Sequence, residues 1–158
     1  MENLNKIGIN EEKSSELANL LSDLLANYSV FYQNARGYHW NLEGDKFFEL
    51  HVKFEELYND LILKIDAVAE RIRTLGFDAE YRYTEYLKTS KIKESSEVKD
   101  GYNSVKEILD AFKVLLVKQR HILDLSDQIS DEGTNSLMSD YIREEEMLVW
   151  MYSAFLNK

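Results

Sequence analysis

The sequence predicts an all-α protein, a four-helix bundle in which one connection is longer than the others. The 158 residues contain no proline and only six glycines, so the residues that usually form turns and end helices are scarce. Apolar residues recur at three- and four-residue spacing in four long segments, which is typical of amphipathic helices. Residues 77–97 lack such a stripe and separate the second segment from the third, which predicts one crossover connection.

The first two helices are predicted to be joined by a short loop. The first covers about residues 11–40, with Asn10 as its N-cap residue. The connection over 41–46 contains a glycine and an aspartate, as turns commonly do. The second helix covers about residues 47–75 and ends before Gly76, where a C-terminal glycine is expected.

The second half of the chain is predicted to hold the crossover and the last two long helices. The crossover over 77–97 contains one short helix near 84–88. Apolar periodicity then returns over about 98–129, is interrupted by SDEGTN at 130–135, and resumes over about 135–156.

The composition predicts a single domain over 1–158 with a short N-terminal tail at about 1–10. Cysteine is absent, which excludes disulfides, thiolate metal sites and cysteine nucleophiles. We find no signal peptide pattern and no apolar run of the roughly 18 residues that a membrane helix needs. We therefore expect a cytoplasmic protein without membrane contacts.

The formal net charge of −10, from 29 acidic and 19 basic residues, restricts the classes of partner. Such a surface repels nucleic acid and anionic lipid and attracts cations. Because acidic residues recur along every segment, solubility is the simplest interpretation of the charge, and a cation site needs further evidence.

A candidate metal-binding face lies on the second predicted helix. His51 and Glu55 are four residues apart, as are Asp66 and Glu70, so each pair shares a helix face. At about 100° per residue, all four lie within an arc of roughly 100° that flanks the core position Phe54. An ordinary solvated helix shoulder is the alternative interpretation.

Two features favour a shared metal site over a solvated shoulder. Val52, Ile62 and Leu63 lie on the same shoulder, and apolar residues at such positions indicate a surface that is covered by another element or chain. Glu55 and Asp66 are about 16 Å apart along the helix axis, too far to bind one ion within a single chain. Two copies packed antiparallel about a two-fold axis would bring the pairs together and form two identical sites.

A di-iron site inside one bundle is not predicted. Ferritin-like carboxylate sites of that kind use Glu-x-x-His on two helices, and the sequence contains no such motif. The third histidine, His121, has no partner at that spacing, and we interpret it as structural or surface.

With these residues in view, the sequence resembles the Dps mini-ferritins, the DNA-protection-during-starvation proteins. The resemblance extends over nearly the whole chain after about residue 17, and its most specific part is the combined spacing over 39–71. It is carried by His39-Trp40-Asn41, Gly44, Phe47-Phe48, Leu50-His51, Glu55, Asp66, Ala69-Glu70-Arg71, Glu85-Tyr86-Leu87, Ile92-Lys93-Glu94, Trp150-Met151 and Ala154-Phe155-Leu156.

The resemblance implies a ferritin-like subunit that assembles into a hollow dodecamer and stores ferric iron. It also implies a ferroxidase centre at each two-fold interface, where two Fe(II) ions react preferentially with hydrogen peroxide. The implied iron ligands are His39, His51 and Glu55 from one subunit with Asp66 and Glu70 from its partner. This division agrees with the two-fold arrangement expected from the helix spacing.

Four further residues are candidates for supporting roles. Trp40 adjoins His39 and Tyr58 lies on the helix of His51, so either could quench a stray oxidising equivalent, although packing is the simpler role. The resemblance also suggests that Asp127 and Glu132, with Asp131 nearby, line an iron-entry pore. Solvated helix-end acids are an equal alternative, and Ser136 stands where some relatives have another acid.

Direct DNA binding is not expected despite the family name. Relatives that condense DNA generally use mobile Lys/Arg-rich tails that neutralise phosphates. Here the first thirteen residues hold two lysines against three glutamates. The alternatives to an iron-oxidising cage are therefore a nucleoid-associated protector that condenses DNA, which the charge disfavours, and a helical interaction protein that has lost its metal site, which the complete ligand set disfavours.

Overall fold

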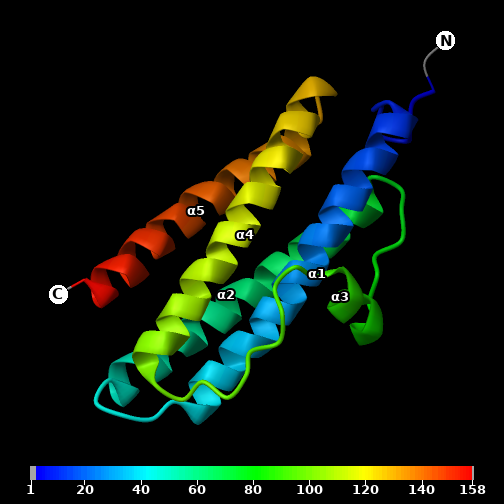
Figure 1. Cartoon of the computed structure of the whole chain (residues 1–158). Helices are drawn as coiled ribbons and strands as arrows, with labels where there is room; N and C mark the ends of the chain where they lie inside the picture. The colour runs from blue at the N-terminus through cyan, green and yellow to red at the C-terminus, as the bar shows by residue number, and fades with distance from the viewer. Residues whose placement is uncertain (1–2, 158) are drawn as a thin grey trace.

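The computed structural model describes residues 3–157, and in this part of the chain it contains five α-helices and no β-strand. They are α1 (Glu11–Asn41), α2 (Phe47–Thr74), α3 (Tyr83–Thr89), α4 (Gly101–Gln128) and α5 (Glu132–Leu156). Figure 1 shows the four long helices side by side, with the short α3 on the outer side of α1. The predicted all-α bundle with a short helix in its crossover is confirmed.

The core lies between the four long helices and is built from the predicted apolar stripes. Leu17, Leu21 and Phe31 of α1 are fully buried, as are Phe54 of α2 and Phe112 of α4. The rings of Phe31 and Phe112 meet edge to face, with centroids 5.2 Å apart. This packing fixes α1 against α4 and leaves one shoulder of α2 outside the core.

The bounds of α1 and α2 agree with the sequence predictions to within one residue, whereas α4 and α5 begin elsewhere. The helix α4 begins at Gly101, three residues later than predicted, because the Asp100 side chain accepts a hydrogen bond from the Asn103 amide at 2.9 Å. The helix α5 begins at Glu132, three residues earlier than predicted. A capping aspartate therefore decides each start, and the onset of apolar periodicity does not.

Asp131 is the residue that caps α5. Its carboxylate accepts a hydrogen bond from the Thr134 amide at 3.1 Å, and it pairs with the Arg71 guanidinium of α2 at 2.6 Å. Gly133 makes room for that guanidinium, because a Cβ at this position would lie 2.6 Å from Nη1 of Arg71. Asp131 is 1% exposed, so it is not one of the solvated helix-end acids, and its carboxylate serves as a buried cap and ion-pair partner.

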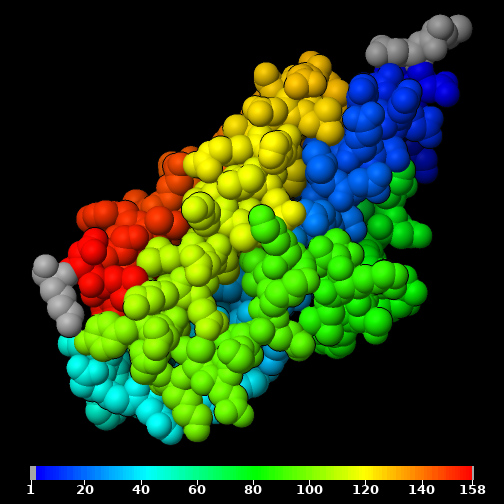
Figure 2. Space-filling model, in the orientation of Figure 1, coloured from blue at the N-terminus to red at the C-terminus, as the bar shows by residue number. Residues whose placement is uncertain are grey.

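The crossover after α2 runs along α1 to the opposite end of the bundle, and Figure 2 shows its atoms covering part of α1. Two asparagines of α1 hold it there. Asn27 Oδ1 accepts hydrogen bonds from the amides of Lys91 and Ile92, and Asn34 Oδ1 accepts one from the Ser95 amide at 2.9 Å. The crossover is thus held against α1 by hydrogen bonds from its backbone amides to asparagine side chains. Hydrophobic periodicity cannot predict such contacts.

The predicted N-terminal tail is in part an ordered cap. Residues 1–2 lie outside the described part of the chain. Over residues 3–10, Asn5 Oδ1 accepts hydrogen bonds from the Ile7 and Ile9 amides, and Asn5 Nδ2 donates one to Ser14 Oγ of α1. The Asn10 side chain accepts from the Lys13 amide, as predicted for the N-cap. Over residues 3–157, no helix is both long enough and apolar enough to cross a membrane.

Candidate metal centre

The two histidines of the candidate site face each other where α1 ends and α2 begins. Gly44, with φ +108°, lies in the short connection that reverses the chain between these helices. The last turn of α1 therefore lies beside the first turns of α2. The rings of His39 and His51 stack with centroids 3.8 Å apart and planes 11° apart.

Reciprocal hydrogen bonds to the backbone determine which ring nitrogen of each histidine carries the proton. His39 Nδ1 lies 2.6 Å from the His51 carbonyl oxygen, and His51 Nδ1 lies 2.8 Å from the His39 carbonyl oxygen. Because a carbonyl can only accept, each Nδ1 donates its proton. In the neutral rings both Nε2 atoms then carry a free lone pair, which is the usual arrangement of metal-binding imidazoles.

Neighbouring side chains hold the two rings in place. The ring of Phe47 stacks on His51 at 4.9 Å, and Tyr58 meets His39 edge-on at 5.3 Å. His39 is 7% exposed. Trp40 is 56% exposed, and the Arg36 guanidinium lies over its ring at 4.7 Å. Of the two residues considered for quenching, Tyr58 is thus in ring contact with a candidate ligand, and the Trp40 ring contacts Arg36.

A carboxylate follows one turn after His51. Glu55 Oε1 lies 3.9 Å from His39 Nε2, and the Glu55 side chain is about half exposed. Glu55 is thus near the imidazoles but free to move toward a cation. Two imidazole nitrogens and a carboxylate form a donor set that suits Fe(II) and several other divalent transition metals.

The second predicted half of the site lies further along α2. Asp66 and Glu70 are both exposed, and Asp66 raises the pKa of the Glu70 carboxyl through a side-chain hydrogen bond and through its negative charge. Two carboxylates this close compete for one proton, and a bound cation would relieve their repulsion. In the solitary subunit they face solvent.

One subunit does not assemble a complete metal site. Within residues 3–157, no group of three or more His, Cys, Asp or Glu side chains is arranged to hold a metal ion. The donor types fit iron, but the two halves are separated along α2. The apolar side chains of Ile62 and Leu63 lie between the two halves and are 40% and 70% exposed, and Val52, next to His51, is 57% exposed. An exposed apolar surface flanked by incomplete sites is typical of a contact with another chain.

The remaining candidate residues lie at the surface. Asp127 and Glu132 are exposed on either side of the α4–α5 turn, and Ser136 is exposed one turn into α5. His121 is exposed on α4, which agrees with its interpretation as a surface residue.

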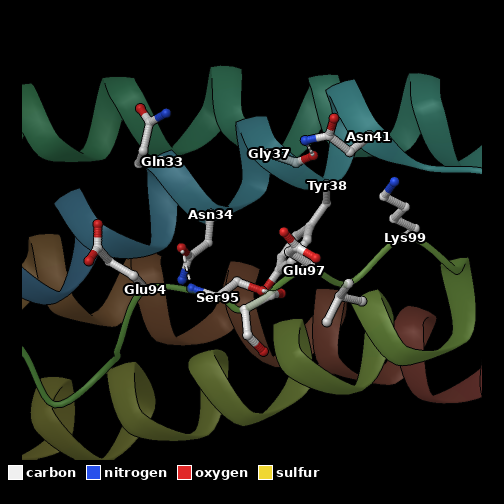
Figure 3. Close-up of a pocket in the computed structure, with 11 residues that line it drawn as sticks. Gln33, Asn34, Gly37, Tyr38, Asn41, Glu94, Ser95, Glu97 and Lys99 are labelled. Atoms are coloured by element: carbon white, nitrogen blue, oxygen red, sulfur yellow. Dashed lines mark hydrogen bonds between the residues drawn. The ribbon is translucent and has the colours of Figure 1, made fainter.

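A polar hollow of about 470 Å³ lies elsewhere, between α1 and the crossover. Figure 3 shows Gln33, Asn34 and Asn41 of α1 on one side of this hollow and residues 94–99 of the crossover on the other. The Ser95 amide donates a hydrogen bond to Asn34 across it. None of the five predicted ligands lines it.

Sequence reasoning missed a buried polar group in the bundle core. Tyr28, Lys64, Gln119 and Glu145 are each at most 3% exposed and contact one another. A signal was present in the sequence, because Lys64 stands among the apolar core positions Leu57, Leu61 and Val68 of α2.

Comparison with known proteins places the chain in a family. The ferritin-like domain family model matches residues 18–158. A DNA protection during starvation protein of Porphyromonas gingivalis is 40% identical over 151 residues, covering 96% of this chain and 95% of that protein. An uncharacterized protein of Haemophilus influenzae is 51% identical over 148 residues, covering 94% of this chain and 92% of that protein.

Solved structures give the same result. The Dps protein of Vibrio cholerae O1, described as a member of a broad superfamily of ferritin-like diiron-carboxylate proteins, superposes with a TM-score of 0.96 and 54% identity over 98% of this chain and 97% of that one. A Dps protein of Bacillus brevis superposes with a TM-score of 0.89 and 32% sequence identity, covering 92% of this chain and 98% of that one. The chain therefore belongs to the Dps family of ferritin-like proteins.

Proposed function

We propose that the chain is an iron-detoxification and iron-storage protein with ferroxidase activity. It oxidises Fe(II) with hydrogen peroxide, or with oxygen, at di-iron sites shared by two subunits. The observation that carries this proposal is the reciprocal pair of Nδ1 hydrogen bonds from His39 and His51 to each other's backbone carbonyl oxygen, which in the neutral rings leaves both Nε2 lone pairs available to bind iron.

The site is completed by a second copy of the chain. Glu55 and Asp66 are about 16 Å apart along α2, so one subunit cannot bind both to one ion. When two α2 helices pack antiparallel about a two-fold axis, Asp66 and Glu70 of one copy reach His39, His51 and Glu55 of the other. The exposed apolar residues Ile62 and Leu63 lie between the two half-sites and Val52 lies beside His51, which supports burial of this face between subunits.

The proposed ligands suit the oxidation of iron. Imidazole and carboxylate bind Fe(II), and carboxylate also stabilises the harder Fe(III) product. Each of two ferrous ions gives up one electron, and both electrons enter the O–O bond of hydrogen peroxide. That bond breaks, and the two oxygens leave as water after taking up two protons. A paired two-electron reduction releases no hydroxyl radical, so iron and peroxide are removed together.

We further propose that these dimers assemble into a hollow dodecamer that stores the ferric product. Asp127 and Glu132 are the candidates for an iron-entry pore, since both are exposed at the α4–α5 turn. Protection of DNA then follows indirectly from the removal of iron and peroxide. The net charge of −10, and the attachment of residues 3–10 to α1, argue against direct condensation of DNA.

Anaerobic loading with Fe(II), followed by peroxide, tests the activity. Formation of Fe(III) is followed by its near-ultraviolet absorbance in the wild type and in the double variant His51→Ala/Asp66→Ala. We expect the double variant to lose the fast oxidation phase. The matched control is His121→Ala, which removes the remaining histidine from an exposed position outside the site. An unchanged rate in the double variant would overturn the site assignment.

A further inference from the structure

The centre of the bundle contains a polar cluster to which each long helix contributes one buried side chain. The Tyr28 hydroxyl of α1 donates to the Glu145 carboxylate of α5. Gln119 Nε2 of α4 lies 2.6 Å from the Tyr28 oxygen and 3.0 Å from Glu145 Oε1. Lys64 Nζ of α2 lies 3.2 Å from Glu145 Oε2. None of these residues belongs to the proposed iron site.

The Lys64 ammonium lies among three carboxylates. Besides Glu145, Asp60 Oδ2 is 3.1 Å and Glu144 Oε2 is 3.4 Å from Nζ, and the Tyr141 ring lies 5.0 Å away. One positive charge thus faces three formal negative charges. Burial alone would lower the pKa of Lys64, but the carboxylates, led by Glu145, raise it above its ordinary value. The side chain therefore remains a cation.

This arrangement does not fit the di-iron site that ferritin-like bundles place between their helices. Such a site needs inward carboxylates from all four helices and two Glu-x-x-His motifs. Here the buried residues of the cluster include one carboxylate, that of Glu145, together with an amide, a phenol and an ammonium. An ammonium in the middle also repels any metal ion.

We infer that Lys64 is a built-in cation that occupies the place of a divalent metal ion in the bundle core and keeps metal out of it. The oxygen ligands that such an ion would use are already present. The carboxylates of Asp60, Glu144 and Glu145 lie within 3.4 Å of Nζ, the first two partly exposed and the third fully buried. Gln119, whose amide contacts Glu145, has its Oε1 buried without a hydrogen-bond partner among residues 3–157. An all-oxygen set of this kind takes hard divalent cations such as Mn²⁺.

Replacing Lys64 by a small residue should convert the cluster into a metal site. In Lys64→Ala the three carboxylates lose their ammonium while the space it filled becomes free. Mn²⁺ bound per subunit is measured by equilibrium dialysis with electron paramagnetic resonance, and thermal unfolding is recorded with and without millimolar Mn²⁺. We expect about one more Mn²⁺ per subunit than in the wild type, and a Tm that rises when Mn²⁺ is added.

The matched control is Lys64→Ala/Glu145→Gln, which leaves the same space but removes the buried carboxylate. We expect it to bind no more Mn²⁺ than the wild type. The proposed iron site is intact in the wild type, in Lys64→Ala and in the control. Any Mn²⁺ bound there is therefore the same in all three proteins and does not affect the difference in Mn²⁺ bound per subunit. The inference stands or falls independently of the ferroxidase proposal.

Three results would overturn the inference. Lys64→Ala could bind no more Mn²⁺ than the wild type, or the control could bind as much as Lys64→Ala. If Lys64→Ala does not fold without metal, it is refolded with Mn²⁺ alongside a second variant, Lys64→Ser. Recovery of folded protein only with Mn²⁺ supports the inference, and failure of both variants with and without Mn²⁺ rejects it.

Discussion

Mixing two inactive variants should restore iron oxidation if the metal site is shared between subunits. One variant carries His51→Ala and the other carries Asp66→Ala. In a dimer of either variant alone, both sites lack one ligand. In a mixed dimer, one site lacks both ligands. The other site takes His39, His51 and Glu55 from the Asp66→Ala chain, and Asp66 and Glu70 from the His51→Ala chain. That second site is complete.

The fraction of active sites that mixing restores follows from random pairing of the two variants. Random pairing of equal amounts makes about half of the dimers mixed, and each mixed dimer has one complete site out of two. About a quarter of the wild-type sites should therefore be recovered. The variants are unfolded together in denaturant, refolded, loaded anaerobically with Fe(II) and mixed with peroxide in a stopped-flow instrument. The amplitude of the fast phase counts the complete sites.

A second mixture gives the matching control. The double variant His51→Ala/Asp66→Ala is mixed with wild type, so that each mixed dimer has one defect in each site. Only the wild-type dimers remain active, and about a quarter of the sites should again be intact. If each site belonged to one subunit, the first mixture would show no rescue and the second would retain about half. That result would refute the shared site.

Four further predictions concern stability, iron entry and DNA. Lys64→Met removes the ammonium group that lies beside the buried Glu145 carboxylate, so the pKa of Glu145 rises further. At neutral pH the free energy of unfolding of this variant should be about 3–5 kcal/mol lower than that of the wild type. This difference in the free energy of unfolding should shrink as the pH falls. Burial raises the pKa of Glu145 in the folded state, so the folded variant takes up a proton at a higher pH than the unfolded chain does and is stabilised by it. Denaturant titrations at several pH values measure this, and a constant deficit would contradict it. Asp131→Ala removes the α5 cap and the partner of the partly buried Arg71 guanidinium, and it should lower the free energy of unfolding by about 3 kcal/mol in the same denaturant titration. A loss below about 1 kcal/mol, on the order of a surface change, would argue against the role of the cap. Asp127→Asn/Glu132→Gln should slow iron uptake into the cage without removing a proposed ferroxidase ligand, and unaltered uptake would reject the pore assignment. A gel-shift titration at low salt, without added divalent metal, should show no tight DNA complex, and a retained complex would contradict the charge argument.

Much of the fold could be predicted because helix periodicity is a local property of the sequence. The stripes of α1 and α2 gave bounds that the structure confirms to within one residue. The starts of α4 and α5 could not be predicted from apolar spacing, because Asp100 and Asp131 cap them with side-chain hydrogen bonds. The partly buried ion pair of Asp131 with Arg71 joins residues that are 60 positions apart, and such contacts have no local signal.

The candidate site was predictable in its residues but not in its contacts. Spacing on one helix identified His51, Glu55, Asp66 and Glu70, and the resemblance to Dps proteins added His39. The structure brings His39 and His51 into ring contact, whereas their assignment as iron ligands stays a prediction. The reciprocal bonds to backbone oxygens depend on how the α1–α2 turn closes, which residue type and spacing do not specify.

The acceptors that orient the two histidines are main-chain atoms, and this affects how the site can change over evolution. Every amino acid carries the same carbonyl group, so no substitution at a neighbouring position can delete the partner of either imidazole. In a site whose histidines are oriented by carboxylates, a single base change can abolish that control. Here the orientation is lost only when a histidine itself is replaced or the turn between the helices is remodelled. The orientation of the two imidazoles is therefore insensitive to substitutions at neighbouring positions that leave the turn intact.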